Sequence, residues 1–245
     1  MKDIKISPFF QDNWRWSIFL KYIVYKLNKY SCIQNSLPSK YVFKESIFGP
    51  KKLRNNVQLF NWSVHNNRIN LARAVCIKSE SYSVLNFLII PKNIYNIPFF
   101  GVDFVTLPNL HLIVLDFQPS LPLEKQFDKE LLKKLINLKN SCHEIVPRAE
   151  KMSDKVENFF SPGVIWSKLP KDCESDNLIS GQIYKSFKDY FNLYLKILFE
   201  SIQVQNDLQN QISMGQKLYL EYRRENDPAR PMLNTLFGKE FTEEL

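Results

Sequence analysis

Metal-binding side chains are scarce in this sequence. Three histidines and four cysteines occur among 245 residues, the cysteines lie far apart, and no two of them form a C-x-x-C pair. Zinc sites need Cys and His ligands at short, regular spacings, so the sequence predicts no metal site. Scattered cysteines in a chain without an export signal are typical of reduced thiols in a cytosol-like compartment.

Long apolar runs and flexible linkers are also missing. The longest apolar stretches, residues 84–91 and 110–117, are much shorter than the roughly 20 residues that cross a bilayer. The first residues, Met-Lys-Asp, are not followed by a continuous apolar segment of the kind found in signal peptides. With only six glycines, no Gly/Ser-rich or Pro-rich stretch divides the chain. We therefore expect a soluble protein, not bound to a membrane, with one domain over residues 1–245.

Positive charge is in excess but dispersed. The chain has 33 Lys and Arg against 25 Asp and Glu, a formal net charge of +8. There is no basic tail, no RNP-like strand motif, no Gly-x-x-Gly clamp and no helix-turn-helix pattern, so the sequence does not predict a nucleic-acid partner. An acidic protein partner, or a ligand that carries carboxylates, explains the charge through electrostatic steering.

The hydrophobic pattern predicts helices at both ends of the chain and strands between them. Residues 14–29 place apolar side chains on one helical stripe. Residues 40–117 form short runs rich in Val, Ile and aromatic residues, divided by turn residues, and these connections are too short for crossover helices. The central sheet is therefore expected to be mainly antiparallel.

Helical periodicity returns in the second half of the chain. The pattern predicts helices over residues 124–142, 178–201 and 207–225, with a strand at 164–169. An α/β fold follows, a three-layer α/β/α sandwich with a central, mainly antiparallel sheet. The aromatic face of the 178–201 helix is more typical of a core than of a cofactor site, because Phe and Tyr bury well.

Asp103 is the first catalytic candidate, because it lies inside the otherwise apolar run 98–108. A carboxylate in such surroundings needs a partner, a ligand or a proton, and burial raises the pKa of a carboxyl group. Perturbed carboxyls gather at functional sites. An aspartate can equally end a strand, cap a turn or pair with an arginine, and the run alone leaves these alternatives open.

Two further polar residues interrupt the pattern. Asn86 lies in the apolar run 84–90, and if the two runs pair as antiparallel strands, Asn86 and Asp103 share one face of the sheet. Leaving a buried amide or carboxyl unpaired costs roughly 1–3 kcal/mol, so the two residues satisfy each other or bind a ligand. Asp227 precedes a proline, which usually marks the end of a helix, and such a turn can place a carboxyl over the sheet.

Several motifs, taken in order, resemble those of ferredoxin-dependent bilin reductases. Each motif alone has little specificity, but their order and combination are highly specific and extend from the first central strands almost to the C-terminus. They are Val84-Leu-Asn-Phe87, Pro98-Phe-Phe-Gly-Val-Asp-Phe-Val-Thr-Leu-Pro108, His111-Leu-Ile-Val-Leu-Asp-Phe-Gln-Pro119, Phe159-Phe-Ser-Pro-Gly-Val-Ile-Trp166, the segment from Tyr222-Arg223 through Asp227-Pro-Ala-Arg230, and Phe237-Gly-Lys-Glu240.

The resemblance implies a radical reduction without flavin, nicotinamide or bound metal. A linear tetrapyrrole, the bilin, would lie between the sheet and the C-terminal helices and take electrons one at a time from reduced ferredoxin. The form of the motif around Asp103 most resembles members that reduce the A-ring diene of 15,16-dihydrobiliverdin to 3Z-phycoerythrobilin. High usage of Asn, Ile and Lys is typical of an AT-rich genome and favours a cyanobacterial cytoplasm. We expect a monomer, with the preceding dihydrobiliverdin-forming reductase as a possible partner.

The same resemblance implies roles for four residues. Asp103 would bind the pyrrole nitrogens or the lactam edge and donate a proton, and Asp227 would deliver a proton to the A-ring. Arg223, four residues before Asp227, would orient it across one helical turn, or alternatively bind a propionate or remain an exposed charge. Asn86 would hold the tetrapyrrole without supplying a proton.

Other functions remain open at this stage. A sister reductase that converts biliverdin to 15,16-dihydrobiliverdin or phytochromobilin would share the fold and both aspartates. A non-enzymatic bilin carrier or an RNA-binding protein would explain the charge and the aromatic residues without needing Asp227.

Overall fold

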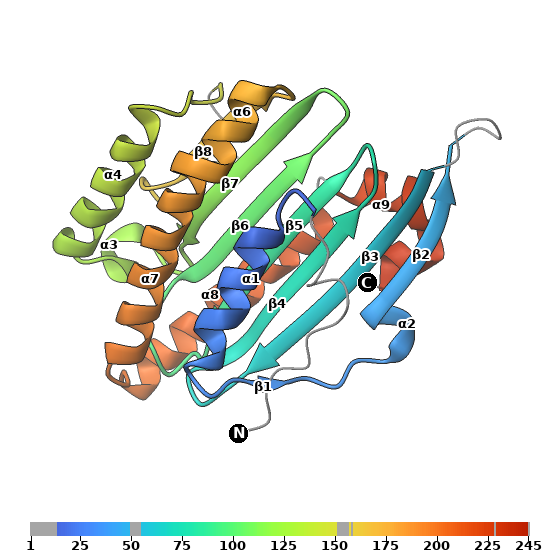
Figure 1. Cartoon of the computed structure of the whole chain (residues 1–245). Coiled ribbons are helices and arrows are strands. Elements are labelled where there is room, and N and C mark those ends of the chain that lie inside the picture. The colour runs from blue at the N-terminus through green and yellow to red at the C-terminus, as the bar shows by residue number, and fades with distance from the viewer. Residues whose placement is uncertain (1–13, 50–54, 151–156, 158, 228, 245) are drawn as a thin grey trace.

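The computed structural model describes residues 14–49, 55–150, 157, 159–227 and 229–244. Within these residues, eight strands form one sheet in the order β1-β3-β4-β5-β6-β7-β8, with β2 also paired to β3, and every pairing is antiparallel (Figure 1). The mainly antiparallel sheet expected from the sequence is confirmed. The strands are β1 Ile33–Gln34, β2 Phe43–Phe48, β3 Asn55–His65, β4 Ile69–Lys78, β5 Ser83–Pro91, β6 Phe99–Thr106, β7 Leu110–Gln118 and β8 Ile165–Pro170.

Helices cover both faces of this sheet. Figure 1 shows α1, α4 and α7 on one face and α8 and α9 on the other. The α/β/α sandwich is therefore confirmed. The longer helices are α1 Ser17–Asn28, α4 Lys129–His143, α7 Tyr184–Glu200, α8 Asn206–Glu225, α9 Arg230–Phe237 and α10 Lys239–Glu244; the short ones are α2 Ser39–Val42, α3 Leu123–Gln126, α6 Cys173–Leu178 and the π-helix Ile179–Ile183.

The helix predicted over residues 178–201 begins earlier than expected. The side chain of Asp172 accepts a hydrogen bond from the backbone N–H of Ser175, which caps a helix that starts at Cys173. The π-helical turn at Ile179–Ile183 then joins this short helix to α7. Periodicity did not reveal the start, because capping depends on one side chain rather than on an apolar stripe.

The face under α1, α4 and α7 carries the main hydrophobic core. Alternate residues of the central strands point to this face, and the aromatic side of α7 packs on them without exposure to solvent. The interpretation of that helix face as core is confirmed. The fully buried aromatic side chains here are Trp16, Phe19, Trp62, Phe87, Phe100, Phe104, Phe117, Phe187, Tyr190, Phe191 and Tyr194.

The opposite face is divided. At one end, a small cluster that includes Leu59 and Val84 packs under α9 and α10, and at the other end Ile90 and Phe99 pack on Tyr219 of α8. Between these clusters, the central strands leave side chains only partly buried, so this part of the sheet is accessible to a ligand. These partly buried residues are Leu71, Arg73, Val75, Asn86, Leu88, Asp103 and Val105.

Asp116 anchors a later segment of the chain to the same face. This carboxyl on β7 is fully buried and accepts two hydrogen bonds from Ser161, one from the backbone N–H at 2.8 Å and one from the hydroxyl at 2.5 Å. Burial raises the pKa of Asp116 to about 7, although the bonds from Ser161 oppose that rise. Close to Ser161 in the chain, Phe159 stacks on Tyr222 of α8, with ring centroids 3.8 Å apart.

We predict that Asp116 makes the stability of the protein depend on pH. The raised pKa means that the folded chain keeps a proton which the unfolded chain releases, so this contribution is complete below about pH 4 and is lost as the pH rises through about 7. One pKa unit corresponds to about 1.4 kcal/mol, so the free energy of unfolding should fall by about 3 kcal/mol between pH 4.5 and pH 7.5 through this group.

Urea unfolding of the wild type and of Asp116→Asn at both pH values measures this contribution. Asn does not titrate, so the fall should be smaller in the variant, whereas the histidines titrate in both proteins and cancel in the comparison. Equal falls in the two proteins would contradict the prediction.

Candidate active site

Asn86 and Asp103 lie side by side on the accessible face. They are direct partners in the antiparallel pairing of β5 with β6. The side-chain amide of Asn86 donates a hydrogen bond to Oδ1 of Asp103. The prediction that these residues share one face is confirmed, and each satisfies a polar group of the other.

Asp103 is not buried in apolar surroundings, and that expectation is wrong. Its side chain is 32% exposed, and its Oδ2 lies 3.5 Å from Nη2 of Arg223. The apolar neighbours Val102 and Phe104 are buried on the opposite face, because side chains alternate along a strand. The alternative that Asp103 pairs with an arginine is the one that the structure shows.

Arg223 reaches the sheet from the last turn of α8. Its Nη1 lies 3.5 Å from the hydroxyl of Tyr219, one turn earlier, and that hydroxyl donates to Oε1 of Gln118 on β7. Burial is the largest single influence on Arg223 and disfavours its charge, but Asp103, Tyr219 and Asp227 together outweigh burial, so the pKa of Arg223 is raised. The guanidinium is thus a permanent cation beside Asp103.

The expected contact between Arg223 and Asp227 is not the one that forms. The helix ends at Glu225, so helical spacing does not extend to Asp227, and in the described part of the chain the ion pair of Arg223 is with Asp103. Asp227 is exposed, and its Oδ1 accepts a hydrogen bond from the backbone N–H of Ala229 at 2.8 Å.

Asp227 nevertheless acts electrostatically on this face of the sheet. Its negative charge contributes to the raised pKa of Arg223, and it partly opposes the lowering of the pKa of Arg73 on β4 by burial and by the charge of Arg223. The charge of the Asp227 carboxylate therefore acts on both arginines. That this turn places a carboxyl over the sheet stays a prediction.

Arg73 and Asn61 are polar residues on this face that sequence reasoning missed. Asn61 on β3 is 5% exposed, and its Oδ1 accepts a hydrogen bond from Nε of Arg73 at 3.1 Å. Burial lowers the pKa of Arg73, and the charge of Arg223 lowers it further. The signal was present, because Arg73 interrupts an apolar strand as Asn86 does.

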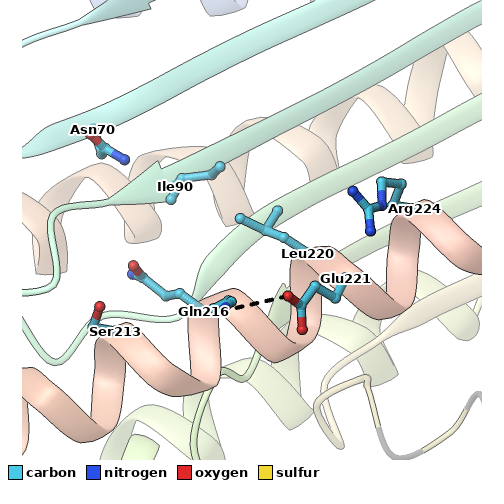
Figure 2. Close-up of a pocket in the computed structure, with 8 residues that line it drawn as sticks. Asn70, Ile90, Ser213, Gln216, Leu220, Glu221 and Arg224 are labelled. Carbon is cyan, nitrogen blue, oxygen red and sulfur yellow. Dashed lines mark ion pairs between the residues drawn. The ribbon is translucent and has the colours of Figure 1, made fainter. Parts of the chain in front are cut away.

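A shallow pocket of about 360 Å³ lies beside α8 at one end of this face. Figure 2 shows Leu220 on α8 beside Ile90 of β5, with Asn70 beyond Ile90 and Arg224 further along α8. Ile90 points to the same face as Leu88 and Asn86, because these residues alternate along β5. The pocket therefore opens on the same face of the sheet as the Asn86–Asp103 pair. Its lining residues are Asn70, Ile90, Ser213, Gln216, Lys217, Leu220, Glu221 and Arg224.

The described residues contain no group of three or more His, Cys, Asp and Glu side chains that could hold a metal ion.

None of the helices in the described part of the chain is both long and apolar enough to cross a membrane. The chemistry that the site itself offers is that of two carboxyls, two guanidinium groups and two amides on one sheet face.

Comparison with known proteins gives close relatives over nearly the whole chain. A phycoerythrobilin:ferredoxin oxidoreductase of Prochlorococcus marinus strain MIT 9301 is 62% identical, over 99% of this chain and 96% of that protein. A second protein of that name, from strain MIT 9211, is 35% identical over 98% of this chain and 93% of its own.

The fold also matches a solved structure. Phytochromobilin synthase from tomato, crystallised in complex with biliverdin, superposes with a TM-score of 0.79 at 24% identity, over 94% of this chain and 80% of that one. The family model for ferredoxin-dependent bilin reductases matches residues 22–245. The chain therefore belongs to the ferredoxin-dependent bilin reductases, as the order of its motifs indicated.

Proposed function

We propose that this enzyme reduces the A-ring diene of 15,16-dihydrobiliverdin to 3Z-phycoerythrobilin through bilin radical intermediates. Two molecules of reduced ferredoxin supply one electron each, and two protons enter the pigment, so that electrons and protons balance. Support comes from a relative that is 62% identical and carries the name phycoerythrobilin:ferredoxin oxidoreductase. The observation that carries the proposal is the Asp103 carboxyl, held between Asn86 and Arg223 on the accessible sheet face.

Asp103 is proposed as the proton donor from the sheet side. The bilin gains electron density with each electron and becomes more basic, so a carboxyl within hydrogen-bond reach can transfer a proton to it. Because Asp103 is a carboxylate paired with Arg223 and its side chain is 32% exposed, it takes up each proton from water before passing it to the bilin. Asn86 binds the tetrapyrrole by hydrogen bonds and orients Asp103, but it has no acidic proton.

Asp227 is proposed as the proton donor from the helix side, toward the A-ring. It follows the C-terminal end of α8 and interacts electrostatically with Arg73 and Arg223. In this proposal Arg223 stabilises negative charge that develops on the bilin while it holds Asp103 in place. The bilin lies between the sheet and α8, with the two carboxyls on its two sides.

The remaining features follow from the same proposal. The electrons pass directly from ferredoxin to the bilin without a bound cofactor, and basic surface residues bind the bilin propionates and acidic ferredoxin. Residues 1–245 act as one domain and as a monomer in the cyanobacterial cytoplasm. The preceding dihydrobiliverdin-forming reductase is a possible direct source of the substrate.

The first test is an anaerobic assay with a ferredoxin-reducing system and each candidate bilin, followed by absorbance. We expect the wild type to convert 15,16-dihydrobiliverdin, and Asp103→Asn and Asp227→Asn each to lose about 100-fold in kcat, because Asn keeps the shape but removes the proton. The dissociation constant for the bilin should change little.

Asp189→Asn is the matched control. This aspartate lies on α7 in the other layer and forms an exposed pair with Lys185, so its replacement should leave kcat unchanged. Full turnover by both site variants would contradict the assigned roles. Reduction of biliverdin in place of 15,16-dihydrobiliverdin would identify a sister reductase, and binding without reduction would identify a carrier.

The second test concerns ferredoxin docking. With a net charge of +8, the enzyme should attract an acidic partner, and salt screens such attraction between exposed charges. We expect the second-order rate of electron transfer, measured by stopped flow, to fall about 10-fold or more between 50 mM and 500 mM salt. The bilin dissociation constant at both salt concentrations is the control. A rate indifferent to ionic strength would show that docking does not depend on charge.

A further inference from the structure

We infer that Gln118 and Tyr219 are positioning residues that hold Arg223 against Asp103, and that residue 101 is glycine because Gln118 needs its space. This inference rests on the proposed function of Asp103 and Arg223. None of these three residues contributes a proton or an electron in the proposed reaction. Each acts through the guanidinium of Arg223.

The contacts form a chain across three strands and one helix. Asn86 on β5 donates to Asp103 on β6, and the Asp103 carboxylate pairs with Nη2 of Arg223 at 3.5 Å. The Nη1 atom of Arg223 lies 3.5 Å from the hydroxyl of Tyr219, which donates to Oε1 of Gln118. The cation of the site is thus held at both ends of its guanidinium.

Gln118 sets the direction in which the Tyr219 hydroxyl points. A phenol has one proton to donate and lone pairs to accept with. Because that proton is directed to Gln118, a lone pair remains for the guanidinium, which can only donate. Burial raises the pKa of Tyr219 to about 12, so the hydroxyl keeps its proton near neutral pH.

Tyr219 and Gln118 are held more rigidly than Arg223, the residue that they position. Tyr219 and Gln118 are each 3% exposed, and the Tyr219 ring stacks on Phe99 with centroids 4.4 Å apart. The side chain of Arg223 is 29% exposed and has a long, flexible stem. Fixing such a side chain before the substrate arrives removes an entropic cost from the reaction.

Gly101 provides the space for this arrangement. A Cβ atom added at residue 101 would lie 2.6 Å from Cδ and 2.9 Å from Nε2 of Gln118. The end of a glutamine side chain can swing away from such a clash, but the movement takes its oxygen away from Tyr219. A methyl group at position 101 should therefore disturb Arg223 without touching it.

The test measures single-turnover kinetics of Tyr219→Phe, Gln118→Met and Gly101→Ala with the bilin that the wild type reduces. Each change should lower the rate of reduction about 10-fold, while the dissociation constant for the bilin stays within about twofold. Tyr219→Phe keeps the stack on Phe99, and Gln118→Met keeps the side-chain length, so both should fold even if Gly101→Ala does not.

Tyr194→Phe is the matched control. It also removes one buried hydroxyl, which donates to the backbone oxygen of Pro98 at 2.9 Å in the other layer of the protein. Its rate of reduction should stay within about twofold of the wild type. An equal loss of rate in Tyr194→Phe and Tyr219→Phe would show that the loss reflects general stability and would overturn the inference.

A double-mutant cycle with Arg223→Gln separates a positioning role from an independent one. If Tyr219 acts through Arg223, Tyr219→Phe should change the rate by less than about twofold once the guanidinium is gone. The same factor in both backgrounds would overturn the inference while leaving the proposed function intact. Wild-type rates in Arg223→Gln would instead contradict the role proposed for Arg223 itself.

Discussion

Alternation of side chains along the central strands is the constraint on which the rest of the structure depends. Successive residues point to opposite faces. One set of positions on β4, β5 and β6 therefore contributes to the aromatic core under α1, α4 and α7, and the other set supplies the polar side chains of the accessible face, on the side of α8. Asp103 is an example, since its neighbours Val102 and Phe104 are buried in the main core, whereas Asp103 lies on the opposite face. The core can therefore be dry and tightly packed while the adjacent face stays open to a charged ligand.

Charge compensation explains how the accessible face can carry charged side chains and still belong to a stable fold. Removing a charged group from water is expensive unless an opposite charge and hydrogen bonds replace the water. Here Arg223 pairs with Asp103, Arg73 is held by Asn61, and the carboxylate of Asp227 acts on both arginines. Two cations and two anions share one region, so neither sign dominates it. In the proposed reaction, these two cations would stabilise the charge that the bilin gains with each electron.

The sequence was sufficient to predict much of the fold and part of the site, and the failures have physical causes. The pairing of Asn86 with Asp103 was predictable because a short connection between two apolar strands restricts their register. The contact of Arg223 was mispredicted because helical spacing was extended past Glu225, where the helix ends. Gln118 lies in the motif 111–119, but nothing indicated its contact with Tyr219, because an aromatic residue on a helix and a glutamine at the end of a strand are both ordinary. Their contact joins residues 101 positions apart, which no local pattern encodes.

The chain position of α8 has a consequence for the order in which the enzyme is made. The sheet is built mainly from residues of the first half of the chain, whereas Tyr219, Arg223 and Asp227 come near the C-terminus. On the ribosome, the strands emerge first and can pair before the last helices have been synthesised. The accessible face then lacks the cation of Arg223 until α8 has been synthesised. A chain that stops before α8 therefore carries most of the sheet but lacks the Arg223 partner of Asp103.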